Sequence, residues 1–332
     1  MRKSLLLLVF LIAGVFLIPQ PGSAKSPEKV KIRLGVGSTI AYSPIYVAKE
    51  KGFYDNEGLD VEFVWAQSAP EVIQGIIGGS LEGGVGASFG VIAGISKGVP
   101  VTTVAIYAYG GDRMALGVRK DAGIKTLKDL YGKKVAFQSG SMGQQMFITM
   151  SSVEGLDTSK IEAVYLENVN MPAALASKSV DAIVTWEPLP SQLEAKGLIS
   201  VIKRGSKYLQ GVGCVVFGTS YIKNNRDVVL RFVKAHFRAA QFARQNPRET
   251  SVINSKYLKQ VDAGPEVMAK IFSYMVFDPR VTQRTFHDLE EDTKFMLSLK
   301  KIETTVNPTR LATTEFSDEI ARQFPALVKD LR

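Results

Sequence analysis

The tetrapeptide Glu-Gly-Leu-Asp occurs twice in the chain, at residues 57–60 and again at residues 154–157. Each copy holds the same place in a longer series. The series is an apolar strand, a turn of small residues, a helix, the tetrapeptide, a second strand, a helix that begins at a proline, and a third strand. The first series covers residues 31–85 and the second covers residues 133–184. Any single match is weak, but the ordered series indicates an internal duplication.

Strands that alternate with helices over short loops are typical of βαβ units, in which helices cover parallel sheets. The duplication therefore predicts an α/β protein of two lobes, each a mostly parallel sheet flanked by helices. Ligands of such sheets bind beyond the carboxyl ends of the strands. We expect the two lobes to face each other there and to enclose a cleft.

Two segments are predicted to connect the lobes. Strands over residues 101–109 and 114–118 flank Gly110-Gly111-Asp112, which we interpret as a hinge because glycine tolerates large changes of backbone conformation. Residues 211–218 predict a strand that returns the chain to the first lobe. The predicted first lobe is thus residues 25–112 with 213–332, and the second is residues 113–212. Further helices are predicted from Asn225 and over residues 265–277, 283–297 and 317–331.

The N-terminus has the pattern of an export signal. A basic head, Met1-Arg2-Lys3, precedes an apolar run over residues 5–18 and the small residues Gly22-Ser23-Ala24. The apolar run is too short to cross a bilayer comfortably. We predict that residues 1–24 are a cleaved signal peptide and that the mature protein is periplasmic; a retained anchor is the alternative. No cysteine follows the run, so a lipid anchor is not expected.

Composition narrows the function classes. The formal charge of +9 falls to +7 without Arg2 and Lys3, and the basic residues are scattered, so no nucleic-acid partner is expected. A dispersed positive charge mildly favours anionic ligands. The single cysteine, Cys214, allows no internal disulfide. We interpret it as a buried side chain of a strand rather than a reactive thiol.

No catalytic or metal-binding motif stands out. The two histidines, His236 and His287, have no cysteine or carboxylate motif beside them, and a zinc site needs three or four protein ligands. Nucleophile-elbow, dinucleotide and Walker-type patterns are missing from the sequence. We therefore expect no enzyme activity, no catalytic residue, no cofactor and no metal.

Six segments of the sequence are informative when taken in order: residues 35–37, 44–54, 57–61, 94–100, 127–133 and 181–188. Together they resemble the nitrate/sulfonate/taurine-type substrate-binding proteins of ABC importers, a family that includes binders of thiamine pyrimidine precursors. The resemblance implies the two-lobe, type II venus-flytrap fold, a small molecule held between the lobes, and permease and ATPase subunits as partners. It does not identify the ligand. We expect a monomer.

The first candidate ligand residues lie in the two turns that precede helices. Thr39 and Tyr42 follow the first strand, and Ser139 and Ser141 occupy the equivalent turn of the second series. Hydroxyl groups and backbone N–H groups at a helix start suit an anion. Ordinary helix capping by these residues is the alternative.

Other candidates follow strand ends. Aromatic side chains there can stack on a planar ligand or pack inside a lobe. The candidates are Trp65 and Gln67 at the end of the second strand, Ser88 and Phe89 after the third, and Tyr107 and Tyr109 at the end of the fourth; Asn168 and Asn170, before Pro172, are weaker.

Trp186 and Glu187 form the sharpest candidate. Pro188 excludes Glu187 from the helical region, so we expect the carboxylate at the strand end to face the opposite lobe. There it would accept hydrogen bonds from an aminopyrimidine-like heterocycle. Alternatively, Glu187 pairs with a lysine or arginine and latches the two lobes together.

Two ligand classes and three functions stay open. A sulfonate-like oxyanion suits the charge and the two turns, and an aminopyrimidine-like heterocycle suits Trp186, Glu187 and the tyrosines. The preferred function is a solute-binding protein of an importer. The alternatives are an enzyme resembling a pyrimidine-precursor synthase, which the export signal disfavours, and a ligand-sensing module for a signalling partner.

Overall fold

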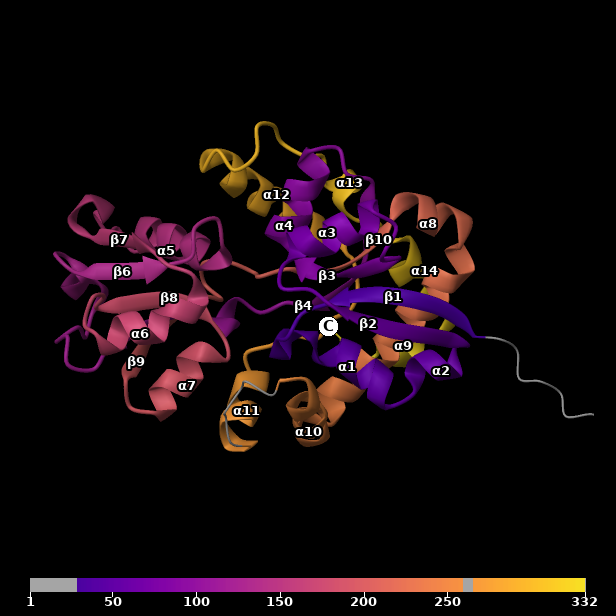
Figure 1. The fold of residues 1–332 in the computed structure, drawn as a ribbon, viewed down its shortest axis with the longest axis horizontal. Coiled ribbons are helices and arrows are strands. Elements are labelled where there is room, and N and C mark those ends of the chain that lie inside the picture. The colour runs from indigo at the N-terminus through magenta and orange to yellow at the C-terminus, as the bar shows by residue number, and fades with distance from the viewer. Residues whose placement is uncertain (1–28, 259–264, 332) are drawn as a thin grey trace, which may run out of the picture.

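The computed structural model describes residues 29–258 and 265–331, so the predicted signal peptide lies outside the described residues. The described strands form two five-stranded sheets, each flanked by helices (Figure 1). We call the first sheet and its helices the first lobe, and the second sheet with α5, α6 and α7 the second lobe. The predicted fold class is confirmed.

The first sheet has the strand order β2-β1-β3-β10-β4. Its strands are β1 (Val30–Val36), β2 (Leu59–Trp65), β3 (Gly83–Ala87), β4 (Val101–Ala108) and β10 (Gly213–Gly218). The second sheet has the order β7-β6-β8-β5-β9. Its strands are β5 (Met114–Arg119), β6 (Lys134–Phe137), β7 (Glu162–Tyr165), β8 (Ala182–Trp186) and β9 (Ile199–Arg204).

Each sheet contains one antiparallel strand. In the first sheet β1 runs parallel to β2 and β3, whereas β10 runs antiparallel to β3 and β4. In the second, β6 runs parallel to β7 and β8, whereas β5 runs antiparallel to β8 and β9. Both antiparallel strands follow a crossing from the other lobe. The two orders match position by position, which supports the internal duplication.

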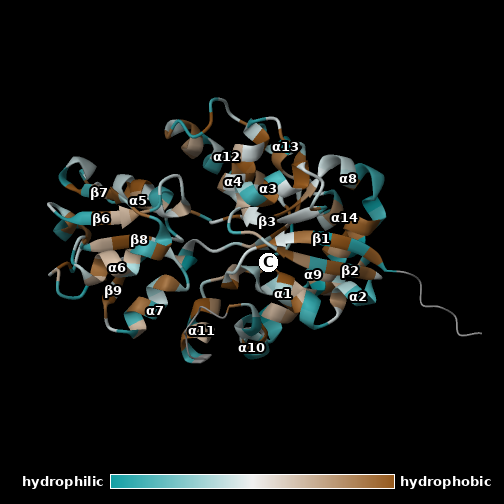
Figure 2. Cartoon of the chain, viewed as in Figure 1, coloured by the Kyte–Doolittle hydropathy of each residue, from teal (hydrophilic) through white to brown (hydrophobic). Residues whose placement is uncertain are grey.

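The helices follow local signals in the sequence. Ser68 caps α3 and Ser141 caps α5 through side-chain oxygens. Figure 2 shows apolar strands inside each lobe and polar residues on the outer faces of the helices. The helices are α1 (Ser43–Glu50), α2 (Phe53–Asn56), α3 (Ala69–Ile77), α4 (Ser88–Ser96), α5 (Met142–Val153), α6 (Met171–Ala176), α7 (Leu189–Ala195), α8 (Thr219–Asn224), α9 (Arg226–Gln245), α10 (Pro247–Tyr257), α11 (Pro265–Phe272), α12 (Gln283–Ser298), α13 (Pro308–Leu311) and α14 (Glu315–Gln323).

Some predicted boundaries were wrong. The helix predicted over residues 265–277 ends at Phe272, and the helix predicted over residues 317–331 ends at Gln323. Strand β9 was not predicted. The sequence of α4, Ser-Phe-Gly-Val-Ile-Ala-Gly-Ile-Ser, has two glycines that lower its helix propensity, so this helix was missed too.

The two connections between the lobes pack tightly against each other. Gly110 N donates a hydrogen bond to Gln210 O at 3.0 Å. A Cβ atom on Gly111 would lie 2.1 Å from the carbonyl oxygen of Leu209. Glycine is therefore required here for close backbone approach. The hinge and the domain boundaries at 112/113 and 212/213 stay predictions, and they fall in these connections.

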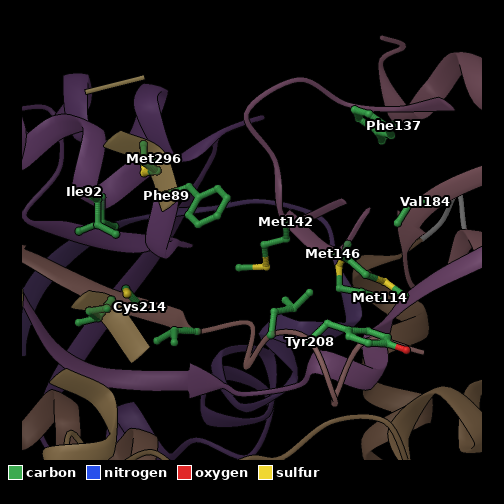
Figure 3. Close-up of a cluster of buried hydrophobic side chains, with 14 of the residues drawn as sticks. Phe89, Ile92, Met114, Phe137, Met142, Met146, Val184, Tyr208, Cys214 and Met296 are labelled. Carbon is green, nitrogen blue, oxygen red and sulfur yellow. The ribbon is translucent and has the colours of Figure 1, made fainter. Parts of the chain in front are cut away.

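A hydrophobic core extends from one lobe into the other (Figure 3). Met142 lies between a first-lobe group that includes Phe89 and Met296 and a second-lobe group that includes Met114. Cys214 belongs to the same core and is fully buried, as predicted, and burial raises the pKa of its thiol to about 12. Within the described part of the chain, no helix is long and apolar enough to cross a membrane.

Candidate ligand-binding cleft

A cavity of about 720 Å³ opens between the two lobes. Residues that follow β1, β2 and β3 line one wall, and residues that follow β6 and β8 line the other. The cavity thus lies at the carboxyl ends of both sets of parallel strands, where the topology predicted it. The predicted site residues that line it are Thr39, Tyr42, Gln67, Tyr107, Ser139, Ser141 and Trp186.

The first-lobe wall is organised by a short turn after β1. Thr39 begins the 3-10 helix Ile40–Tyr42, and its N–H donates to the hydroxyl of Tyr46 at 3.3 Å. The ring of Tyr42 meets that of Tyr107 edge-on, with centroids 4.7 Å apart. Burial, reinforced by the neighbouring tyrosines, raises the pKa of Tyr42 well above its usual value. Both phenols are therefore neutral at physiological pH.

The second-lobe wall is the start of α5. Ser141 Oγ accepts hydrogen bonds from the N–H groups of Gly143 and Gln144, at 3.1 and 3.4 Å. Gly140 has φ +67°, a left-handed conformation that glycine adopts at little cost. Lys301, from the segment after α12, donates to Ser139 Oγ at 3.3 Å. Ser141 therefore serves as a helix cap and also lines the cavity.

Arg113 lies in the first connection between the lobes and lines the cavity. Its side chain is 7% exposed. One Nη donates to the thioether sulfur of Met142 at 3.2 Å, a weak acceptor, and Nε is buried without a partner. No carboxylate within residues 29–258 or 265–331 forms an ion pair with it. The cavity thus contains a buried, uncompensated positive charge.

Glu187 does not face the opposite lobe, contrary to expectation. Its carboxylate is buried inside the second lobe, where Arg204 Nη1 and Ser191 Oγ both donate to Oε1 at 2.8 Å. The guanidinium of Arg204 also stacks on the ring of Tyr274, 3.6 Å from its centroid. The structure thus agrees with the alternative in which Glu187 pairs with a basic residue.

Two further candidates lie away from the cavity lining. Ser88 is buried and donates to Asp292 Oδ2 at 2.6 Å, because the start of α4 turns its hydroxyl toward α12. Asn170 is exposed at the end of the 3-10 helix Asn168–Asn170, while Asn168, at the start of that turn, lines the cavity. Among the aromatic candidates, Phe89 lines the cavity, whereas Trp65 is 55% exposed outside it.

Comparison with known proteins identifies the family. The model of the NMT1/THI5-like family matches residues 39–250, well over half of the chain. The chain belongs to the NMT1/THI5-like family. The segments that carried the predicted resemblance lie mostly within this match.

Relatives of this NMT1/THI5-like protein include binding proteins and an enzyme. It is 28% identical to a putative aliphatic sulfonates-binding protein of Bacillus subtilis over 270 residues, 79% of this chain and 80% of the relative. It is 24% identical to 4-amino-5-hydroxymethyl-2-methylpyrimidine phosphate synthase of Legionella pneumophila over 231 residues, 67% of this chain and 71% of the enzyme.

The fold of this NMT1/THI5-like protein matches a solved binding protein. It is similar to the alkanesulfonate-binding protein SsuA of Xanthomonas axonopodis pv. citri bound to MOPS, with a TM-score of 0.73 and 17% identity. The likeness covers 87% of this chain and 99% of SsuA. At that identity it shows the shared fold, which is the predicted two-lobe fold.

Several lining residues of this NMT1/THI5-like protein carry little signal in the sequence. Arg113 follows Gly-Gly-Asp, a turn pattern that predicts exposure rather than burial. Met296 and Lys301 come from the C-terminal part, where an amphipathic pattern does not say what a helix packs against. The one feature of the sequence that could have pointed to Arg113 as a site residue is that it is a single arginine between two apolar strands. Within the described residues, no group of three or more His, Cys, Asp or Glu could hold a metal.

Proposed function

We propose that this chain is the solute-binding protein of an ABC importer and that it captures a small organic anion, a sulfonate, between its lobes. The observation that carries the proposal is the buried guanidinium of Arg113, which has no carboxylate partner among the described residues. A buried cation without a counter-charge is costly, and an anionic ligand would supply the missing charge.

The surroundings of Arg113 suit a tetrahedral oxyanion. A guanidinium donates two parallel hydrogen bonds to such a group, which gives strength and orientation together. Thr39 and Ser139 add hydroxyl groups on the two facing walls, and Lys301 adds a second positive charge. The N-terminal end of α5 contributes a favourable dipole. Phe89 and Trp186 offer apolar surface for the organic part of the ligand.

The relatives support the same ligand class. The Bacillus subtilis relative is named for aliphatic sulfonates, and SsuA was solved with MOPS, a compound that carries a sulfonate. The aminopyrimidine alternative loses its main support, because the Glu187 carboxylate is engaged by Arg204. The carboxylate that does line the cavity, Glu167, is exposed.

We propose binding without catalysis, although one relative is a synthase. His236 is buried against Ile106 O, and neither histidine is among the residues that line the cavity. Capture then works as a population shift, since only a closed cleft lets a ligand contact both lobes. Residues 1–24 would direct the chain to the periplasm, and permease and ATPase subunits would receive the ligand.

Calorimetric titration with butanesulfonate tests the proposal. Arg113→Met should weaken binding by about ten- to a hundredfold, the value of a charge-assisted hydrogen bond. Arg113→Lys keeps the positive charge, so it should lose less affinity for butanesulfonate than Arg113→Met. Because the change to methionine removes an uncompensated buried charge, the ligand-free Arg113→Met protein should be no less stable than the native protein, which separates lost binding from misfolding. Equal affinity of the native and Arg113→Met proteins would contradict the proposal.

A further inference from the structure

A buried carboxylate ties the two lobes together beside the cavity. Asp292, on α12 of the first lobe, is 6% exposed. Ser88 Oγ, also of the first lobe, donates to its Oδ2 at 2.6 Å. Gln145 Nε2, on α5 of the second lobe, donates to its Oδ1 at 2.9 Å. The hydrogen bond to Gln145 therefore crosses between the lobes.

The contact lies at the wall of the cleft. One helical turn after Asp292, Met296 lines the cavity. Three residues before Gln145, Met142 lines it from the opposite side. Any movement that separates α5 from α12 would break the hydrogen bond between Gln145 and Asp292 and admit water to the carboxylate. Closing the cleft would bury it again.

No positive charge compensates Asp292. Among the described residues, no lysine, arginine or histidine pairs with it. The charged groups that influence its pKa, Asp288 and Glu291, lie on the same helix and are negative. Helices α4 and α5, which pack against it, contain no charged residue. Helix α13, which packs against α12, contains one basic residue, Arg310, whose side chain is exposed. Cys214 of β10 faces it too, and its thiol stays protonated because its pKa is about 12.

These surroundings favour the neutral acid. Burial raises the pKa of Asp292 to about 6, against the opposing hydrogen bonds of Ser88 and Gln145, and Asp288 and Glu291 raise it further. An ionised carboxylate has four acceptor positions, of which two are used here. Gln145 Oε1 is buried without a partner. The proton of the neutral acid could be donated to that oxygen after rotation of the amide.

We propose that Asp292 is a proton-operated latch between the lobes: the neutral acid favours the closed cleft, and the ionised carboxylate favours the open one. The latch regulates the cleft of the proposed function. It operates without ligand, so it can be tested even if the proposed ligand is wrong.

The sign and size of the effect follow from linkage. In an open cleft water reaches Asp292, so its pKa would fall toward the ordinary carboxyl value of about 3.9. The closed state, with its raised pKa, then binds the proton more tightly. Its advantage is complete below about pH 4 and is lost as the pH rises through about 6. The ratio of closed to open protein should rise by up to about tenfold between pH 7.5 and pH 5.

Spin labels on the two lobes test the latch in ligand-free protein. Lys125→Cys in the second lobe and Lys223→Cys in the first place labels at exposed positions, while Cys214 is buried. Distance distributions from electron spin resonance at pH 5 and pH 7.5 should shift toward shorter separations at pH 5. Asp292→Asn removes the titration and should abolish the shift. Glu290→Gln, on the same helix and not among the charged groups that influence the pKa of Asp292, should retain it.

The spin-label distances of the Asp292 variants decide whether Asp292 operates the latch. Asp292→Leu provides a second non-titrating variant should the Asp292→Asn protein fold poorly, and it should also show no shift. A native protein without a pH-dependent shift, or an Asp292 variant that shifts like the native protein, would overturn the latch. Neither result bears on Arg113, whereas failure to bind butanesulfonate at any pH would leave a working latch intact.

Discussion

Replacing Glu187 with glutamine should change the stability of the protein and leave ligand affinity alone. The carboxylate lies within the second lobe, bonded to Ser191 and Arg204, and it is 1% exposed. Glutamine keeps the shape of the side chain and one acceptor oxygen, but it removes the negative charge. Arg204 would then be left with a largely buried charge and no carboxylate beside it.

The size of the loss can be bounded from these contacts. Removing one partner of a buried ion pair costs about 3–5 kcal/mol. Glutamine retains a neutral hydrogen bond, and Arg204 keeps its hydrogen bond to Asp112 O at 2.8 Å and its stacking on Tyr274. We therefore expect the free energy of unfolding to fall by about 2–3 kcal/mol. The affinity for butanesulfonate should stay within about twofold, since about 1.4 kcal/mol corresponds to tenfold.

Urea unfolding and calorimetric titration of the same preparations measure the two effects. Glu162→Gln on β7 is the matched control: Glu162 pairs with Lys134 at 3.5 Å in an exposed position. It should cost less than about 0.5 kcal/mol. A Glu187→Gln protein of native stability that binds the sulfonate more than about tenfold more weakly would refute the reasoning. It would mean that the carboxylate contacts the ligand.

Two other predictions concern stability. Gly111→Ala would bring Cβ within 2.1 Å of Leu209 O, a backbone atom that cannot rotate away. The substitution should therefore destabilise the fold by about 3 kcal/mol or more in thermal unfolding. Gly78→Ala is the control and should be nearly neutral, because the atom nearest to its Cβ is 3.3 Å away. Native stability of Gly111→Ala would disprove the close approach. Burial lowers the pKa of His236 to about 4, so its contribution is present above about pH 6.5 and lost as the pH falls toward 4, by roughly 3 kcal/mol. His236→Gln, which can still donate to Ile106 O, should flatten that part of the stability curve; an unchanged acid dependence would exclude His236 as its source.

Local signals predicted much of the fold. The bounds of α5 were predicted correctly because both ends have a local signal in the sequence: Ser141 is a strong N-cap, and Glu154-Gly155 ends the helix. The direction of β5 and β10 was not predicted. Their pairing depends on strands that are distant in the sequence, and a periodic pattern does not say which way a strand runs.

The cleft was predicted in position and only partly in composition. The strand-end rule located Thr39 and Ser139 because both follow a strand of the duplicated unit. Arg113 was missed because its side chain is buried against Met142 of α5, which lies in the second lobe and 29 residues further along the chain. The orientation of Glu187 depends on Arg204, and the sequence alone left open whether such a partner existed.

The second sheet is built from one unbroken stretch of chain, and its two ends meet. Gly205 N donates to Met114 O at 3.1 Å, so the first and last strands of that sheet begin and end beside each other. A gene segment encoding residues 114–204 could therefore be exchanged between relatives with only two junctions, which lie side by side in the connections between the lobes. The exchanged segment would include the second-lobe wall of the cavity, whereas Arg113 and the C-terminal helices lie outside it. Recombination in this family could thus keep Arg113, the proposed contact of the anionic group, and exchange the second-lobe residues that contact the rest of the ligand.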